Sequence, residues 1–80
     1  HGTWPGKDAG LTEREADTLT LLVKGLENDA IAEQLYVSPN TVKARLKSIY
    51  RKIGAGNRVQ AALWAVDHGF EPDRRIDWAG

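Results

Sequence analysis

The sequence contains no cysteine and only two histidines, His1 and His68. Without cysteine the chain cannot form a disulfide framework or a thiolate metal site. No second ligand stands at metal-binding spacing from either histidine. No apolar run approaches the roughly 20 residues of a membrane span, and no signal-peptide pattern opens the chain. We therefore expect a cytoplasmic protein with no metal site and no membrane association.

Residues suited to catalysis are equally scarce. Ser38 and Ser48 have no base close to them in the sequence. No glycine-rich loop precedes a helix in the strand context that a phosphate-binding loop requires. These absences predict that the protein is not an enzyme, uses no cofactor and has no small-molecule site in this domain.

Acidic residues are missing from one long stretch, between Gln34 and Val66, although the whole chain has zero net charge. The same stretch carries six basic residues, namely Lys43, Arg45, Lys47, Arg51, Lys52 and Arg58. Segregated charge of this kind creates a local positive field on a neutral molecule. The field suits a nucleic acid or an acidic protein partner. A solvated basic face without a role is the alternative.

Size and composition indicate one small folded domain. The chain has 80 residues, of which 41% are hydrophobic, enough for a single small domain. Residues 1–10 are rich in glycine and show no periodicity, so we expect a linker or tail. Residues 71–80 have the character of a C-terminal tail. The domain is predicted to occupy residues 11–70.

Residues 28–53 form the centre of this domain and are predicted to be two helices joined by a short turn. Asn28 is expected to cap the first helix. Ser38 followed by Pro39 is a strong start signal for the second, because serine caps free N–H groups and proline fits the first helical position. The second helix, 39–53, places its apolar residues on one face, the predicted core: Val42, Leu46, Ile49 and Ile53. Small and basic side chains lie opposite, which suits entry into the DNA major groove.

Two further helices are predicted on either side. In the helix at 11–24, Thr12 and Glu15 have the spacing of a capping box. Asn57 is a cap candidate for the helix at 57–68, in which the expected core residues are Val59, Ala62, Leu63 and Val66. The remaining sides of that helix carry Ala61, Trp64 and Ala65, and a helix that is apolar nearly all round needs a second partner. The predicted fold class is all-α with four helices.

Four sequence blocks in order resemble one family. The blocks are L-T-x-R-E at 11–15, G-x-x-N-x-x-I-A at 25–32, V-S-P-N-T-V-K at 37–43 and K-I-G-A-x-N-R at 52–58. Together they are similar to the LuxR-type (GerE-like) helix-turn-helix domain, and the resemblance covers about residues 10–70. It implies a tetrahelical DNA-binding module of a bacterial transcription regulator. Such modules usually lie at the C-terminus, behind a ligand-sensing domain or the receiver domain of a two-component response regulator.

The resemblance also implies roles for individual residues. The base-facing positions of the third helix are Lys43, Ala44 and Lys47. The phosphate-binding positions are Ser38, Thr41, Arg45 and Arg51. The fourth helix commonly supplies the dimer contact in that family, and here the candidates are Ala61, Trp64 and Ala65. For Trp64, packing within the domain is an equal alternative. Many members have histidine where this chain has Arg45, so two roles stay open for Arg45: a phosphate contact, or coverage of apolar surface by its aliphatic stem.

The function predicted from the sequence is specific binding to double-stranded DNA, with helix 39–53 in the major groove. A homodimer, weak in the isolated domain, would read a palindromic operator, and RNA polymerase is a further candidate partner. Two alternatives stay open. A sigma-factor region 4 module also follows an L-T-x-R-E helix with a helix-turn-helix, although the extra helix at 57–68 argues against it. A protein-interaction module would instead dock its basic helix on an acidic protein.

Overall fold

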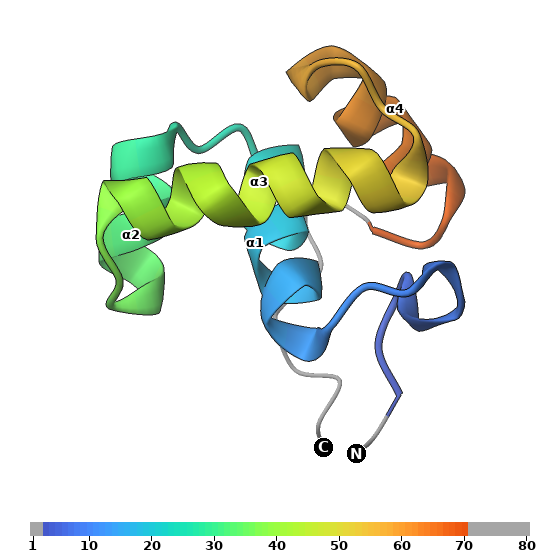
Figure 1. Ribbon diagram of the computed structural model, residues 1–80, viewed down its shortest axis with the longest axis horizontal. Coiled ribbons are helices and arrows are strands. Elements are labelled where there is room, and N and C mark those ends of the chain that lie inside the picture. Colours follow the sequence, from blue (N-terminus) through green and yellow to red (C-terminus); the bar gives the residue numbers. More distant parts are fainter. Residues whose placement is uncertain (1–2, 71–80) are drawn as a thin grey trace.

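The computed structural model describes residues 3–70, and the regular elements in that part of the chain are helices. They are a short 3-10 turn η1 (Lys7–Ala9), followed by α1 (Glu13–Val23), α2 (Asn28–Leu35), α3 (Pro39–Ile53) and α4 (Arg58–Asp67). Helix α3 crosses α1, with α2 beside its first half and α4 at its far end (Figure 1). The all-α, four-helix prediction is confirmed. The predicted tail at 71–80 lies outside the described residues.

Three of the four α-helices begin at the caps that the sequence predicts. The capping side chains are Thr12 for α1, with both bonds of its capping box to Glu15, Ser38 for α3 and Asn57 for α4. Helix α2 differs, because Asn28 is its first helical residue. Glu27 takes the cap position and makes no side-chain cap bond. The predicted cap role of Asn28 is therefore wrong, and its side chain is left for other contacts.

The core surrounds α1, which is buried on most of its circumference, and the other helices each contribute one side before Phe70 closes it. Val42 and Ile49 are fully buried and Leu46 is nearly so, which confirms the apolar face predicted for α3. Ile53 packs at the margin of the same cluster. After α4, Gly69 adopts a left-handed conformation with φ 94°. This turn carries Phe70 back into the core, where its N–H donates to the carbonyl of Ala65.

Helix α4 packs with the side opposite to the one predicted. Ala61 and Ala65 have no exposed surface, whereas Val59, Leu63 and Val66 are 68%, 64% and 50% exposed. Because this helix is apolar on nearly every side, its periodicity does not select the buried face. The smaller side chains take the side that meets the core, where they let the helix backbone approach closely.

The segment before α1 folds against the domain instead of forming a linker. The indole Nε1–H of Trp4 donates to the carbonyl of Leu11 at 2.9 Å, and Trp4 packs against the core. The turn that allows this needs Gly6, with φ 83° and no room for a Cβ, which would lie 2.5 Å from Cδ1 of Leu11. The ammonium of Lys7 lies 4.8 Å from the centre of the Trp4 ring. The predicted linker at 1–10 is therefore wrong for residues 3–10.

Candidate nucleic-acid interface

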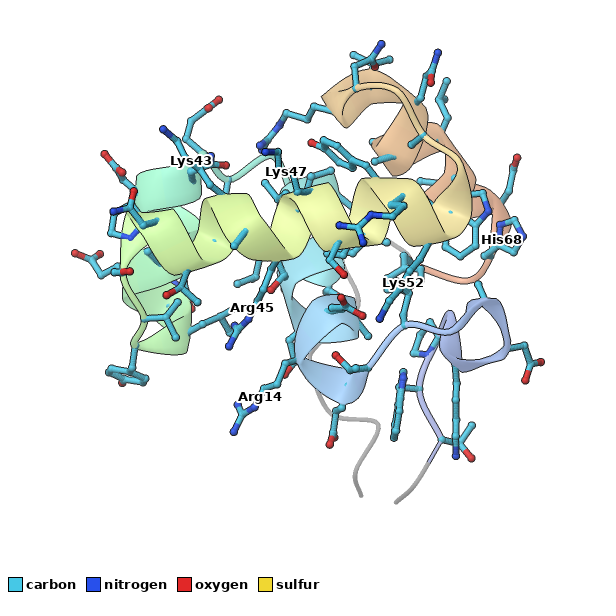
Figure 2. All side chains as sticks on the ribbon, viewed as in Figure 1. Arg14, Lys43, Arg45, Lys47, Lys52 and His68 are labelled. Carbon is cyan, nitrogen blue, oxygen red and sulfur yellow. The ribbon has the colours of Figure 1, made fainter. Side chains whose placement is uncertain are left out.

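The face of α3 that points away from the core is small and basic. It carries the exposed residues Lys43, Ala44, Lys47 and Arg51. No side chain among the described residues forms an ion pair with any of its three cations. Figure 2 shows Lys43 and Lys47 along one edge of α3 and Arg45 along the other. The three residues predicted to face the bases thus lie together on one accessible surface.

A groove of about 500 Å³ runs beside this face. Its lining combines the lysines, Ala44 and Leu46 with two residues that were not among the predicted DNA contacts, Asn28 of α2 and Tyr50 of α3. Asn28 is available because it does not cap its helix. The only sequence signal for Tyr50 was its position on the flank of α3 opposite Arg45. An amide and a phenol here can donate and accept hydrogen bonds beside the lysines.

The N-terminal end of α3 presents two hydroxyl groups. Oγ of Ser38 accepts the N–H of Thr41 at 3.2 Å, and the two side-chain hydroxyls lie 3.0 Å apart. One hydroxyl hydrogen is used between them, so the other is free to donate to an anion. The free N–H groups and the dipole of the helix end also favour negative charge. This arrangement suits the predicted phosphate contacts of Ser38 and Thr41.

Arg45 lies apart from the other predicted phosphate contacts, on the flank of α3 that faces α1. Its guanidinium and that of Arg14 extend on the same side of the domain (Figure 2), where both charges act on Asp17. Burial and the nearby Glu13 raise the pKa of Asp17, and the two arginines oppose that rise. Asp17 therefore offsets part of the positive charge that Arg45 would offer to DNA.

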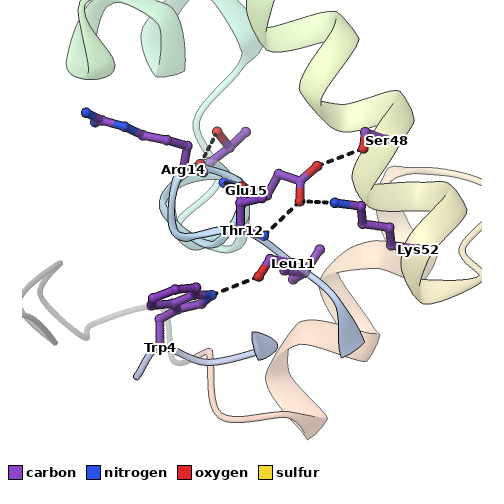
Figure 3. A network of polar contacts seen from close by, with 8 residues as sticks. Trp4, Leu11, Thr12, Arg14, Glu15, Ser48 and Lys52 are labelled. Atoms are coloured by element: carbon purple, nitrogen blue, oxygen red, sulfur yellow. Dashed lines mark hydrogen bonds and ion pairs between the residues drawn. The ribbon is translucent and has the colours of Figure 1, made fainter. Parts of the chain in front are cut away.

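Glu15 connects α1 to the same flank of α3. Its Oε1 accepts from the ammonium of Lys52 at 2.7 Å and from the N–H of Thr12 at 2.9 Å. Its Oε2 accepts from the hydroxyl of Ser48 at 2.7 Å (Figure 3). Burial alone would raise the pKa of Glu15. Hydrogen bonds from Lys52, Thr12 and Ser48, with the charge of Lys52, outweigh burial and lower that pKa.

These contacts divide the six basic residues of the acid-free stretch. Lys52 is paired with Glu15, and Arg58 donates from Nη2 to the backbone carbonyl of Leu26. Arg45 faces Asp17. The charges that remain directed to solvent are those of the α3 face described above. The positive surface is therefore smaller than the charge count of the sequence suggests, because Lys52 and Arg58 are bonded within the fold and Asp17 offsets part of the charge of Arg45.

Two of the three predicted dimer residues are inaccessible to a partner. Ala61 and Ala65 are fully buried within the chain, so they cannot contact a second copy while the domain is folded. Trp64 is half-buried and stacks on His68, with ring centres 3.9 Å apart. It also lies against Phe70, at 6.3 Å between ring centres. Ala61 and Ala65 were predicted to be accessible because the opposite face of α4 was assigned to the core.

Other kinds of site find little support in the part of the chain that the structure describes. Across residues 3–70, no group of three or more histidine, aspartate or glutamate side chains is placed to hold a metal ion. In the same range, no helix is long and apolar enough to cross a membrane. The α3 face and its adjoining groove remain the feature with a recognisable chemistry.

Comparison with known proteins decides the family. Residues 9–65 match the family described as bacterial regulatory proteins, luxR family. The chain belongs to the LuxR family. It is thus a helix-turn-helix DNA-binding domain of a family of transcription regulators, as the four sequence blocks predict.

Several regulators are similar to this LuxR-family domain. The transcriptional regulatory protein YdfI of Bacillus subtilis is 49% identical over 60 residues, covering 75% of this chain and 28% of that protein. The CsgBAC operon transcriptional regulatory protein of Escherichia coli is 44% identical over 62 residues, covering 78% of this chain and 29% of that protein. The present chain therefore spans less than a third of the length of these relatives.

Proposed function

We propose that this LuxR-family domain binds specific sequences of double-stranded DNA by placing α3 in the major groove. The observation that carries the proposal is the exposed face of α3, where two lysines that form no ion pair with the described residues lie beside an alanine. The ammonium groups of Lys43 and Lys47 can donate to guanine O6 and N7, and the methyl of Ala44 can contact thymine. A bulky residue in place of Ala44 would hold the helix away from the base edges.

Phosphate contacts would fix the register of α3 in the groove. The candidates are the hydroxyls and free N–H groups at Ser38 and Thr41, together with the guanidinium of Arg51. Such contacts position a protein on DNA without reading its sequence. Asn28 and Tyr50 are additional candidates, because they line the groove beside the lysines. We give Arg45 a lesser phosphate role, since it shares its flank with Asp17.

We also propose that two copies pair through the outer face of α4, formed by Val59, Leu63 and Val66. Their exposure makes them suitable for a contact that the buried Ala61 and Ala65 cannot make. A two-fold pair would set two recognition helices about 34 Å apart on a palindrome. The pair would bury six of these side chains, three from each copy, and their burial would stabilise the dimer by roughly 6–12 kcal/mol. Association costs about 4–15 kcal/mol, so we expect a weak dimer that DNA strengthens.

The experiment is fluorescence anisotropy of the 80-residue chain with duplex DNA enriched from a random library, across a salt series. Log affinity should fall linearly with log salt, with a slope of about 0.9 per phosphate contacted. The enriched duplex should bind more tightly than a scrambled one. If no duplex binds at low salt, an acidic protein partner becomes the better hypothesis. An acidic surface of RNA polymerase would be one such partner.

Lys47→Ala tests the assigned face. Because Lys47 is exposed and forms no ion pair within residues 3–70, the variant should melt like wild type but lose about 1–3 kcal/mol of binding to the enriched duplex. Lys24→Ala is a matched control, since Lys24 is also exposed but caps the far end of α1. Equal affinities for wild type and Lys47→Ala would contradict the assignment.

A further inference from the structure

The carboxylate of Glu15 is the polar bridge between α1 and the recognition helix. Glu15 is 6% exposed, and its two oxygens accept from the side chains of Ser48 and Lys52 at 2.7 Å each. The donors lie 33 and 37 residues along the chain from Glu15. Ser48 and Lys52 are one helical turn apart on α3 (Figure 3). Two points of attachment on successive turns resist both sliding and rotation of a helix.

Rotation of α3 about its axis decides where its lysines point. The apolar contacts of Val42 and Ile49 are non-directional, so they tolerate small rotations that keep the same side chains covered. Short hydrogen bonds to a buried carboxylate are directional. With a helix radius of about 5–6 Å, a rotation of about 20° moves the outer side-chain atoms by roughly 2 Å. Recognition of a base edge requires the contacting group to lie within about 0.5 Å of its productive position. A displacement of about 2 Å would therefore misplace Lys43 and Lys47.

The same bridge determines which cations are available to DNA. Lys52 follows Arg51 at the end of α3, but its ammonium is paired with Glu15 instead of facing solvent with the lysines. A paired lysine releases no counterion from DNA and adds nothing to the salt dependence of binding. The sequence alone shows Lys52 only as one of the six basic residues of the acid-free stretch.

We propose that Glu15 is a positioning residue for DNA recognition, which fixes the rotation of α3 and withholds Lys52 from the phosphates. This inference rests on the proposed function, because it concerns how the same α3 face reads DNA. Glu15 itself touches no base or phosphate in this scheme. It acts through Ser48 and Lys52.

The test compares variants of the whole chain on two duplexes, one enriched with the wild-type protein and one scrambled, across a salt series. Glu15→Gln should reduce the affinity ratio between the duplexes about tenfold, the value of one base contact. The same variant should steepen the salt slope by about 0.9, because Lys52 is released. Lys52→Met should leave the slope unchanged. The double variant should return to the wild-type slope and keep the lower ratio.

Two controls separate positioning from stability and charge. Thr12→Ala removes the hydroxyl that caps the same end of α1, so it destabilises the helix while leaving Glu15 bonded to α3. Glu13→Gln makes the same charge change at the first residue of α1, where the side chain forms no ion pair with α3 among the described residues. Both controls should keep the wild-type ratio between the duplexes.

Each remaining outcome is decisive. If Glu15→Gln matches Thr12→Ala in ratio and slope, Glu15 is only a stabilising residue and the inference fails. If Lys52→Met lowers the slope by about 0.9, Lys52 contacts phosphate and the inference also fails, even where Glu15→Gln does not fold. If the wild-type chain enriches no duplex, the proposed function is refuted, and the inference with it.

Discussion

Replacing Leu63 by serine tests the outer face of α4 at its centre. Leu63 is 64% exposed and stands between Val59 and Val66 along the helix. Complete burial of such a side chain stabilises by about 1.5–3 kcal/mol, so covering the exposed two-thirds is worth about 1–2 kcal/mol. A two-fold dimer buries two copies and would lose about 2–4 kcal/mol in total. The dissociation constant should therefore rise roughly 30- to 700-fold.

Sedimentation equilibrium over a range of protein concentrations measures this change directly. The monomer should keep its fold, because an exposed substitution alters stability by about 0.5 kcal/mol or less. Tyr36→Asn is the matched control. Tyr36 is 95% exposed in the turn before α3, and its left-handed φ of 57° suits asparagine. Wild-type self-association in Leu63→Ser, or an equal loss in Tyr36→Asn, would refute the α4 contact.

Two further predictions concern stability. Val42→Ala removes two methyl groups from a fully buried site on α3. It should lower the free energy of unfolding, measured by urea denaturation, by about 1–3 kcal/mol. A loss no larger than the roughly 0.5 kcal/mol of an exposed substitution would contradict its place in the core. Glu15 should make the domain sensitive to acid, because its folded pKa lies below the ordinary value. Its contribution is complete above the unfolded pKa of about 4.3 and is lost as the pH falls through the folded pKa. The raised pKa of Asp17 has the opposite effect and is common to wild type and Glu15→Gln. The wild-type chain should therefore lose more stability on acidification than the variant does, and parallel curves would refute the linkage.

The features predicted correctly from the sequence are those set by interactions within one or two helical turns. Thr12 and Glu15 form their capping box between residues three apart, and Ser38 and Asn57 cap by the same short-range bond. The core face of α3 was also readable, because strongly polar residues alternate with apolar ones around that helix. The four family blocks then gave the order and identity of the helices.

The errors arise where the sequence offers several equivalent choices or where partners are far apart. On α4, Leu63 and Ala65 are both apolar, so periodicity favours neither face and tertiary packing decides. Glu15 meets Lys52 across 37 residues, a contact that no local pattern encodes. Trp4 packs on the core from a segment whose glycines indicated a linker. In each case the deciding contact joins elements that are separate in the sequence.

The partition of charge explains how a chain of zero net charge can offer a basic surface to DNA. The acids lie against one flank of α3 only: Glu15 and Asp17 of α1 face the flank that carries Arg45 and Lys52. The acids of α1 offset the positive fields of these two cations within the domain. The lysines on the other side form no ion pair with the residues that the structure describes, and acids farther away than the Debye length of about 8 Å are largely screened. A DNA phosphate at the α3 face would therefore respond to the local charge and not to the net charge of the molecule.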